Sequence, residues 1–244
     1  DQRSPARHPD WLGPDDLAVK IEQLREATDW RLPVHVKLGA CRVDDDVKLA
    51  AKAGADAIII DSMVAGTGAS AEVLIEHSGI PTVPAIVMAR EALRELGLYG
   101  KVSLIASGGI RHGADAAKAL ALGADAVAIG LASLIALNCN REIPESDFET
   151  EIGVPAGFCH HCHTGKCPVG IATQNPELTK RLDPDEGAER VANFLNSMTM
   201  EMALLTRSLG KSDVHSLEPE DLAALTIEAS AMARVPLVGT NKIY

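Results

Sequence analysis

The pattern of hydrophobic and polar positions divides the first part of the chain into short strands and amphipathic helices. Residues 34–38 alternate strictly between the two classes, which predicts a half-buried strand. Short aliphatic runs predict three more strands, at residues 57–61, 102–106 and 126–129. Apolar residues at helical spacing predict helices at residues 15–29, 44–52, 85–96 and 114–122, and a further helix that begins at residue 71.

A short internal repeat supports this division. Residues 53–60 and 122–129 both read as a helix that ends at glycine, an Ala-Asp turn and a buried strand. Strands that alternate with helices indicate a parallel sheet with right-handed crossovers. An open α/β sheet would satisfy this pattern, but we favour a (β/α)8 TIM barrel.

Two successive strands run into glycine-rich loops that precede a helix. The first loop contains Ser107, Gly108 and Gly109, and the second passes from Gly130 to the helix start at Leu131. Glycines let backbone N–H groups approach an anion at such a place. They could instead only make tight turns. In TIM barrels a phosphate site often follows strands 7 and 8, so the four strands are expected to be the fifth to eighth of the barrel.

Lys37 is the candidate catalytic residue, because the alternation places it on the inner face near the end of its strand. A cation there could stabilise the negative charge that a flavin gains on reduction. The alternative is a salt bridge at the mouth of the barrel. His35 lies one layer deeper and is expected to be a hydrogen-bonded core residue.

Residues 159–167 hold three cysteines and three histidines, a density that is typical of a metal site. Structural zinc accepts such ligands. An iron–sulfur cluster is the alternative, since it uses closely spaced thiolates and often a Cys-Pro at the end of the run. Cys139 could supply a further ligand. The ligand types alone do not decide between the two metals.

The remaining sequence suggests a tail of two helices, at residues 185–209 and 220–233, which we expect to pack on the barrel or on a partner subunit. The expected organisation is therefore half a barrel at 1–138, an acidic insert and cysteine loop at 139–175, and a helical tail at 176–244. Four strands are half of what a barrel needs, so the chain reads as the C-terminal half of one, although its 244 residues approach the ~250 of a complete barrel.

Composition narrows the function. The net charge of −11 and the 3% aromatic content argue against binding to nucleic acid. The longest uncharged stretch, residues 126–140, is shorter than the ~20 residues of a spanning helix, so no membrane role is expected. No secretion signal is visible, which predicts a cytoplasmic protein with free or metal-bound thiols.

Residues 162–174 contain the run Cys-x4-Cys-Pro-x-Gly-Ile-Ala-Thr-Gln, and with residues 132–139 they resemble the FMN domain of the glutamate synthase family. The motifs at residues 36–38, 66–70 and 107–109 follow the family's order, so the resemblance covers about residues 9–194. It implies a (β/α)8 barrel that binds FMN and a [3Fe-4S] cluster and reduces 2-iminoglutarate, the imine of 2-oxoglutarate, to glutamate.

The resemblance also assigns residues. Lys37 would contact substrate and flavin, and the FMN contacts would come from the glycine-rich loops, at Gly66, Thr67, Gly68, Ser107, Gly108, Gly109, Gly130 and Leu131. The cluster ligands would come from Cys139, Cys159, Cys162 and Cys167. Expected partners are a glutaminase-like or other synthase subunit, and an electron-donor subunit or ferredoxin.

The chain departs from the family pattern at two places. An acidic insert at residues 140–158 separates Cys139 from the other cysteines, so Cys159 could replace Cys139 as the third ligand or be a fourth. Ser107 stands where the family's Asp-Gly-Gly motif has its aspartate. These features look most like separate-subunit relatives such as the C subunit of N-methylglutamate synthase, which would use methylamine in place of ammonia.

Two other functions fit parts of the sequence. A phosphate-binding barrel oxidoreductase of the inosine monophosphate dehydrogenase type needs a catalytic cysteine after its sixth strand, and residues 61–70 contain none. A non-catalytic assembly subunit with a barrel-like fold could use the cysteine segment to bind zinc.

Overall fold

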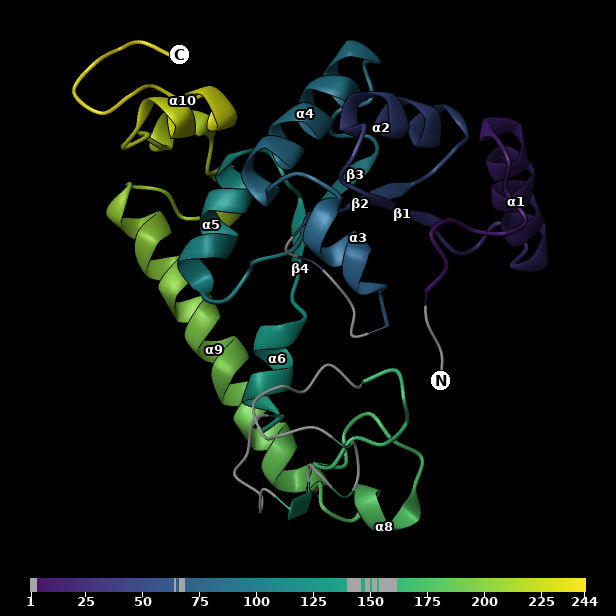
Figure 1. Ribbon diagram of the computed structural model, residues 1–244. Helices are drawn as coiled ribbons and strands as arrows, with labels where there is room; N and C mark the ends of the chain where they lie inside the picture. The colour runs from purple at the N-terminus through teal and green to yellow at the C-terminus, as the bar shows by residue number, and fades with distance from the viewer. Residues whose placement is uncertain are drawn as a thin grey trace.

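The computed structural model describes residues 4–63, 65, 69–139, 146–147, 150, 153 and 162–244. Four strands form one parallel sheet in the order β1-β2-β3-β4, and helices connect them (Figure 1). The strands are β1 (His35–Gly39), β2 (Ala57–Asp61), β3 (Ser103–Ser107) and β4 (Ala126–Ala128). Each lies within one or two residues of its predicted position, because aliphatic runs and their flanking turns mark strands locally.

The helices around the sheet also follow the predicted pattern. They are α1 (Pro14–Ala27), α2 (Val43–Lys52), α3 (Glu72–His77), α4 (Thr82–Glu95), α5 (Gly113–Ala121) and α6 (Leu131–Ala136). Helix α2 packs against β1 and β2, α4 against β2 and β3, and α5 against β4. The structure is therefore an α/β fold with the parallel, helix-connected topology that a partial (β/α) barrel requires.

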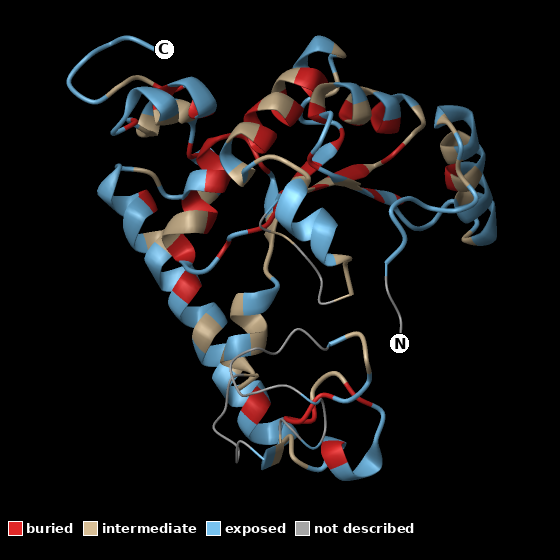
Figure 2. Ribbon diagram, viewed as in Figure 1, coloured by how far each residue is buried: buried red, intermediate tan, exposed pale blue. Residues whose placement is uncertain are grey.

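One face of the sheet forms the hydrophobic core. Val36, Ile58 and Leu104 are neighbours across three strands and are 0–5% exposed, and Ile60 and Ala106 are buried in the next row. Figure 2 shows buried residues concentrated along the sheet and on helices α2 and α4. Burial of β-branched and aliphatic side chains between sheet and helices is the main source of stability here.

The opposite face of the same strands is open within the described part of the chain. His35, Lys37 and Ser103 are exposed there, and Ile59 and Ile105 are half-buried. The expectation that His35 is a core residue is wrong for this structure, because its side chain is exposed, although Ala57, its register partner on β2, is buried. Lys37 does point to this face, as the alternation predicted.

The aspartates of the two copies of the internal repeat have the same structural role. Asp56 accepts a 2.7 Å hydrogen bond from the amide of Val34, and Asp125 accepts one of 2.7 Å from the amide of Leu104. Each carboxylate thus pairs with the backbone of the strand before it, at the entry to its own strand. The repeat marks the two places where an incoming strand is tied to its neighbour.

The tail begins with α8 (Pro176–Thr179) and the long helix α9 (Pro184–Ser208), which matches the helix predicted at residues 185–209. The second predicted helix, residues 220–233, is wrong in part. The structure has two 3-10 turns, η1 (Val214–Ser216) and η2 (Pro219–Asp221), and then α10 (Ile227–Ala233). The chain is extended between them because Ala224 bridges to Leu237, and the Thr226 hydroxyl then caps α10 by accepting the amide of Ala229.

Among the described residues, no helix is both long enough and apolar enough to cross a membrane.

Candidate functional site

Three polar side chains meet at the carboxyl-terminal edge of the sheet. The Lys37 ammonium on β1 lies 3.1 Å from Oδ2 of Asp61 at the end of β2. The hydroxyl of Ser107 at the end of β3 donates a 2.7 Å hydrogen bond to Oδ1 of the same carboxylate. The parallel register pairs Asp61 with Ser107, and it pairs Lys37 with Ile59, two residues before Asp61. The register of the three strands therefore brings these side chains together.

This group lies where an α/β protein binds its ligands, outside the carboxyl ends of parallel strands. Its single cation, Lys37, is half exposed on the open face, with a side-chain exposure of 49%. An ammonium at that point can attract and orient a carboxylate or an oxyanion. The salt bridge that the sequence offered as the alternative role of Lys37 is present. Its carboxylate, that of Asp61, lies at the same edge of the sheet.

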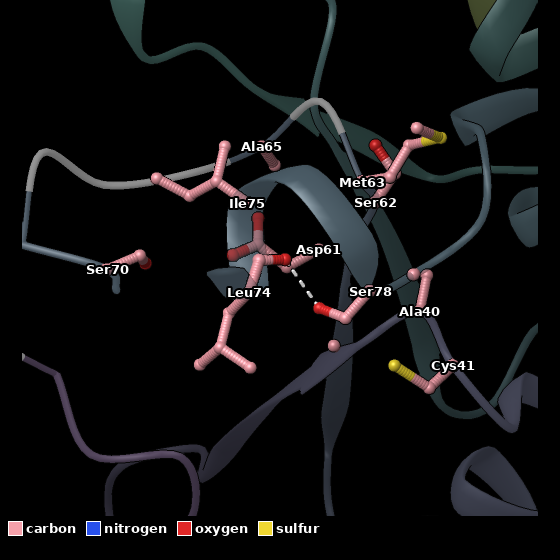
Figure 3. A pocket seen from close by; sticks show the side chains of 12 residues that line it. Ala40, Cys41, Asp61, Ser62, Met63, Ala65, Ser70, Leu74, Ile75 and Ser78 are labelled. Atoms are coloured by element: carbon pink, nitrogen blue, oxygen red, sulfur yellow. Dashed lines mark hydrogen bonds between the residues drawn. The ribbon is translucent and has the colours of Figure 1, made fainter. Parts of the chain in front are cut away.

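A small cavity of about 120 Å³ opens beside Asp61 (Figure 3). The loops after β1 and β2 and helix α3 enclose it, with Cys41, Ser62, Met63, Leu74, Ile75 and Ser78 among the lining residues. Figure 3 shows the Asp61 carboxylate between the Ile75 and Leu74 side chains and the loop that carries Ser62 and Met63. The space next to the carboxylate is therefore partly apolar and holds little more than a few heavy atoms.

Hydrogen bonds from two hydroxyl groups hold the first glycine-rich loop in place. The Thr82 hydroxyl, at the start of α4, donates to the carbonyl of Gly108 at 2.8 Å. Because this bond uses the only hydrogen of the Thr82 hydroxyl, the Ser62 hydroxyl is the donor in its 2.7 Å hydrogen bond with Thr82. Gly108 has φ +112°, and a Cβ there would lie 2.1 Å from the Ser62 oxygen. Only glycine fits this position, for both conformational and steric reasons.

The second glycine-rich loop lies beside the first. Ser107 pairs with Ala128, and Gly109 and Gly130 each follow two residues later at the same edge. Within the described residues, the backbone amides of Gly109 and Gly130 have no hydrogen-bond partner, and both residues are exposed. Adjacent exposed amides of this kind suit a phosphate group. Leu131 begins α6 next to them and is 68% exposed.

Several predicted site residues lie outside this description. Gly66, Thr67 and Gly68 of the loop after β2, and Cys159, are not among the described residues. Their predicted roles therefore stay predictions.

The other cysteines are placed but not assembled into a metal site. Cys139 follows α6 and is half-buried, Cys162 is exposed, and Cys167 is buried. Among the described residues, no three His, Cys, Asp or Glu side chains are arranged to hold a metal ion. The residues that can be described thus do not by themselves fit a zinc ion or an iron–sulfur cluster, although their thiols are the chemistry that either would use.

Asp61, Ser62 and Thr82 were not predicted as site residues. Asp61 was the last residue of a predicted strand, and a carboxylate at the carboxyl end of a buried barrel strand is itself a signal for a site. Ser62 and Thr82 carried no such signal, because their contact joins two loops that are 20 residues apart.

Comparison with known proteins gives a consistent result. Residues 1–146 and 147–212 match the family model of the conserved region in glutamate synthase. A glutamate synthase large subunit-like protein of Rhizobium meliloti is 54% identical over 99% of this chain and 54% of its own length. An archaeal glutamate synthase [NADPH] of Methanocaldococcus jannaschii is 44% identical over 89% of this chain and 39% of its own length.

A glutamate synthase [NADPH] large chain of Bacillus subtilis is more distant, with 33% identity over 85% of this chain and 12% of its own length. The chain therefore spans about half, or less, of the curated relatives that it matches. The family model covers most of the chain, and the three matches agree with it. The chain belongs to the glutamate synthase family, whose conserved region it carries.

Proposed function

We propose that this chain is part of a glutamate synthase-type oxidoreductase that reduces the imine of 2-oxoglutarate to L-glutamate with FMN. The observation that carries the proposal is the placement of Lys37 and the two exposed glycine amides, Gly109 and Gly130, along one edge of the sheet. The named relatives supply the reaction class, since three of them are glutamate synthases or like one.

The residues present fit a flavin phosphate. Gly109 and Gly130 offer amides from neighbouring loops that have no partner in the part of the chain that the structure describes, and the Ser62–Thr82–Gly108 contacts hold the first loop in place. FMN bound there would supply hydride chemistry at an imine carbon. The protein's own contribution would be to hold the phosphate, and to present the Lys37 ammonium on the open face to the substrate carboxylate or to the charge that develops on reduction.

The open face of the sheet supports the barrel form of this proposal. Ile59 and Ile105 are half-buried on the face opposite the hydrophobic core, and within the described residues strands β1 and β4 each have one unpaired edge. A second set of four strands would cover that face and remove both edges. We infer that β1–β4 are strands five to eight of a (β/α)8 barrel, and that the rest belongs to the part of the relatives' length that this chain does not span.

The cysteine segment has a separate place in the proposal. The thiols of Cys139 or Cys159, with those of Cys162 and Cys167, would hold a [3Fe-4S] cluster, and such a cluster would supply one-electron chemistry. The electron donor would be a partner subunit or a ferredoxin. Among the described residues, the cysteines do not by themselves form a ligand set. The nitrogen would be ammonia from a glutaminase-like partner, or methylamine in the N-methylglutamate branch.

The test uses the chain within its longer polypeptide or with its partner subunits, prepared without oxygen. We expect visible flavin absorbance, FMN released by acid, and glutamate formed from 2-oxoglutarate and ammonia when a reduced donor is added. Lys37→Met should keep the flavin and lose most of the glutamate formation. Lys52→Met, which changes an exposed lysine at the end of α2, is the matched control and should not.

A colourless preparation that contains zinc and no flavin would contradict the proposal. It would instead favour the zinc-binding assembly subunit.

A further inference from the structure

The Asp61 carboxylate links the other two polar side chains of the site, because each of its oxygens contacts a side chain from a different strand. Oδ1 accepts the Ser107 hydroxyl from β3, and Oδ2 faces the Lys37 ammonium from β1. Its side chain is 21% exposed, against 49% for Lys37. The carboxylate is thus the more enclosed and better fixed partner of the ion pair.

Lysine carries its charge on a flexible four-carbon stem, so its backbone position alone does not fix where the ammonium lies. At an exposed position, the stem would sample several rotamers and spread the charge over the open face. The carboxylate that meets it at 3.1 Å limits this freedom. Ser107 in turn holds the carboxylate from the other side, so Asp61 cannot turn toward Lys37 or away from it freely.

We propose that Asp61 is a positioning residue, which fixes the Lys37 ammonium at the edge of the sheet, and that Ser107 holds Asp61 in that orientation. This rests on the function proposed above, since it is the role of Lys37 toward substrate that makes its position matter. It departs from the resemblance, which assigned residue 107 to a phosphate contact. Here the Ser107 hydroxyl is committed to Asp61 instead.

Asp61→Asn in the longer protein or complex is the test. The amide keeps the shape of the side chain and an oxygen that accepts the Ser107 hydroxyl, but it removes the charge that holds Lys37. We expect flavin content and Tm to stay near the wild-type values while kcat falls by about 10- to 100-fold, the effect of a catalytic group displaced by about 1 Å. KM should change less than kcat, and Asp61→Glu should recover part of the loss.

A second readout does not depend on turnover. The rate at which an amine-acylating reagent modifies Lys37, followed by mass spectrometry, should rise severalfold in Asp61→Asn because the ammonium is no longer held in the ion pair. The rate at Lys52 serves as an internal control and should not change. Ser107→Ala should raise the Lys37 rate by a smaller factor, because it frees the carboxylate without removing it.

Unchanged kcat and unchanged Lys37 modification in Asp61→Asn would overturn the proposal. So would a loss of kcat that only follows a loss of flavin or a fall in Tm, because that is the behaviour of a structural residue. If the wild-type protein binds no flavin, the proposed function fails. The acylation experiment still decides whether Asp61 positions Lys37.

Discussion

The backbone amide of Gly113, the first residue of α5, donates a 2.6 Å hydrogen bond to the carboxylate of Glu201 in α9. The helices approach closely here, since a Cβ on Gly113 would lie 2.3 Å from the carbonyl oxygen of Met198. Helix α5 follows the loop that contains Gly108 and Gly109. A residue of the C-terminal tail therefore sets where the helix after that loop begins.

Removal of this contact should weaken the attachment of α9 to α5. Glu201→Ala leaves the Gly113 amide without its acceptor and is expected to lower the free energy of unfolding by about 1–2 kcal/mol, as the loss of a helix cap does. Glu201→Gln keeps an acceptor and should cost less. Urea unfolding measures both, with Glu189→Gln on the exposed side of α9 as the control. A cost of Glu201→Ala no larger than that of the control would contradict this role.

The braced glycine loop gives a second prediction. Gly108→Ala places a Cβ against Ser62 and puts an alanine at φ +112°, so we expect a loss of at least about 2 kcal/mol of stability and weaker flavin binding. Gly39→Ala is the matched control, because a Cβ there meets nothing within 4 Å. Thermal unfolding and flavin titration measure the two effects. Equal stability of the two variants would show that the loop is not braced as described.

The tail should respond to pH through Lys211 and Asp221. The hydrogen bond from Lys211 and the amide of Glu218 lower the pKa of Asp221, and the hydrogen bond to Asp221 raises the pKa of Lys211. The carboxylate's contribution is present above the usual aspartate pKa of about 4 and disappears as the pH falls through the lowered value. The ammonium's contribution is present below about 10.5 and disappears as the pH rises through the raised value.

Hydrogen exchange of residues 214–222 should therefore be slowest, after correction for its intrinsic pH dependence, between these two limits and faster outside them. Lys211→Met should remove most of this dependence. Lys101→Met, at an exposed lysine on the loop before β3, should leave it intact. If the tail of Lys211→Met exchanges as slowly as that of the wild-type protein at neutral pH, the ion pair does not hold it.

Neighbouring residues on β3 test which face of the sheet is buried. Leu104 is fully buried, so Leu104→Ala should cost about 2–5 kcal/mol. Ile105 points to the open face and is half-buried, so Ile105→Ala should cost less in this chain. In the longer protein the cost of Ile105→Ala should rise toward that of Leu104→Ala, since a closed barrel would cover this face. Chemical unfolding of both variants in both lengths gives the comparison.

Much of the sheet could be predicted from sequence because its signals are local. An aliphatic run of five residues, a glycine at a helix end and an Ala-Asp turn all act within one unit, and so the four strands and the position of Lys37 were predicted correctly. The break after Asp221 was missed because it depends on a bridge between Ala224 and Leu237, which helical spacing does not show.

The polar contacts of the site were the part that sequence could not supply. Asp61 meets Lys37 and Ser107 only through the register of three strands, and Thr82 reaches Gly108 across 26 residues. His35 was misjudged for a related reason, since its burial depends on whether anything covers the inner face. Periodicity predicts which face a residue takes but not what lies opposite it.

The close packing of α6 and α9 has a consequence for the length of the segment between them. The Leu137 side chain lies so close to Gly187 that a Cβ there would be 2.8 Å away, and Arg190 donates to the carbonyl of Ala136 at 3.1 Å. The chain thus leaves and re-enters the fold at two helices that are fixed to each other. The two ends that the intervening residues connect are therefore held at one separation by α6 and α9, and the entropic cost of joining two fixed ends grows only slowly with the number of residues between them.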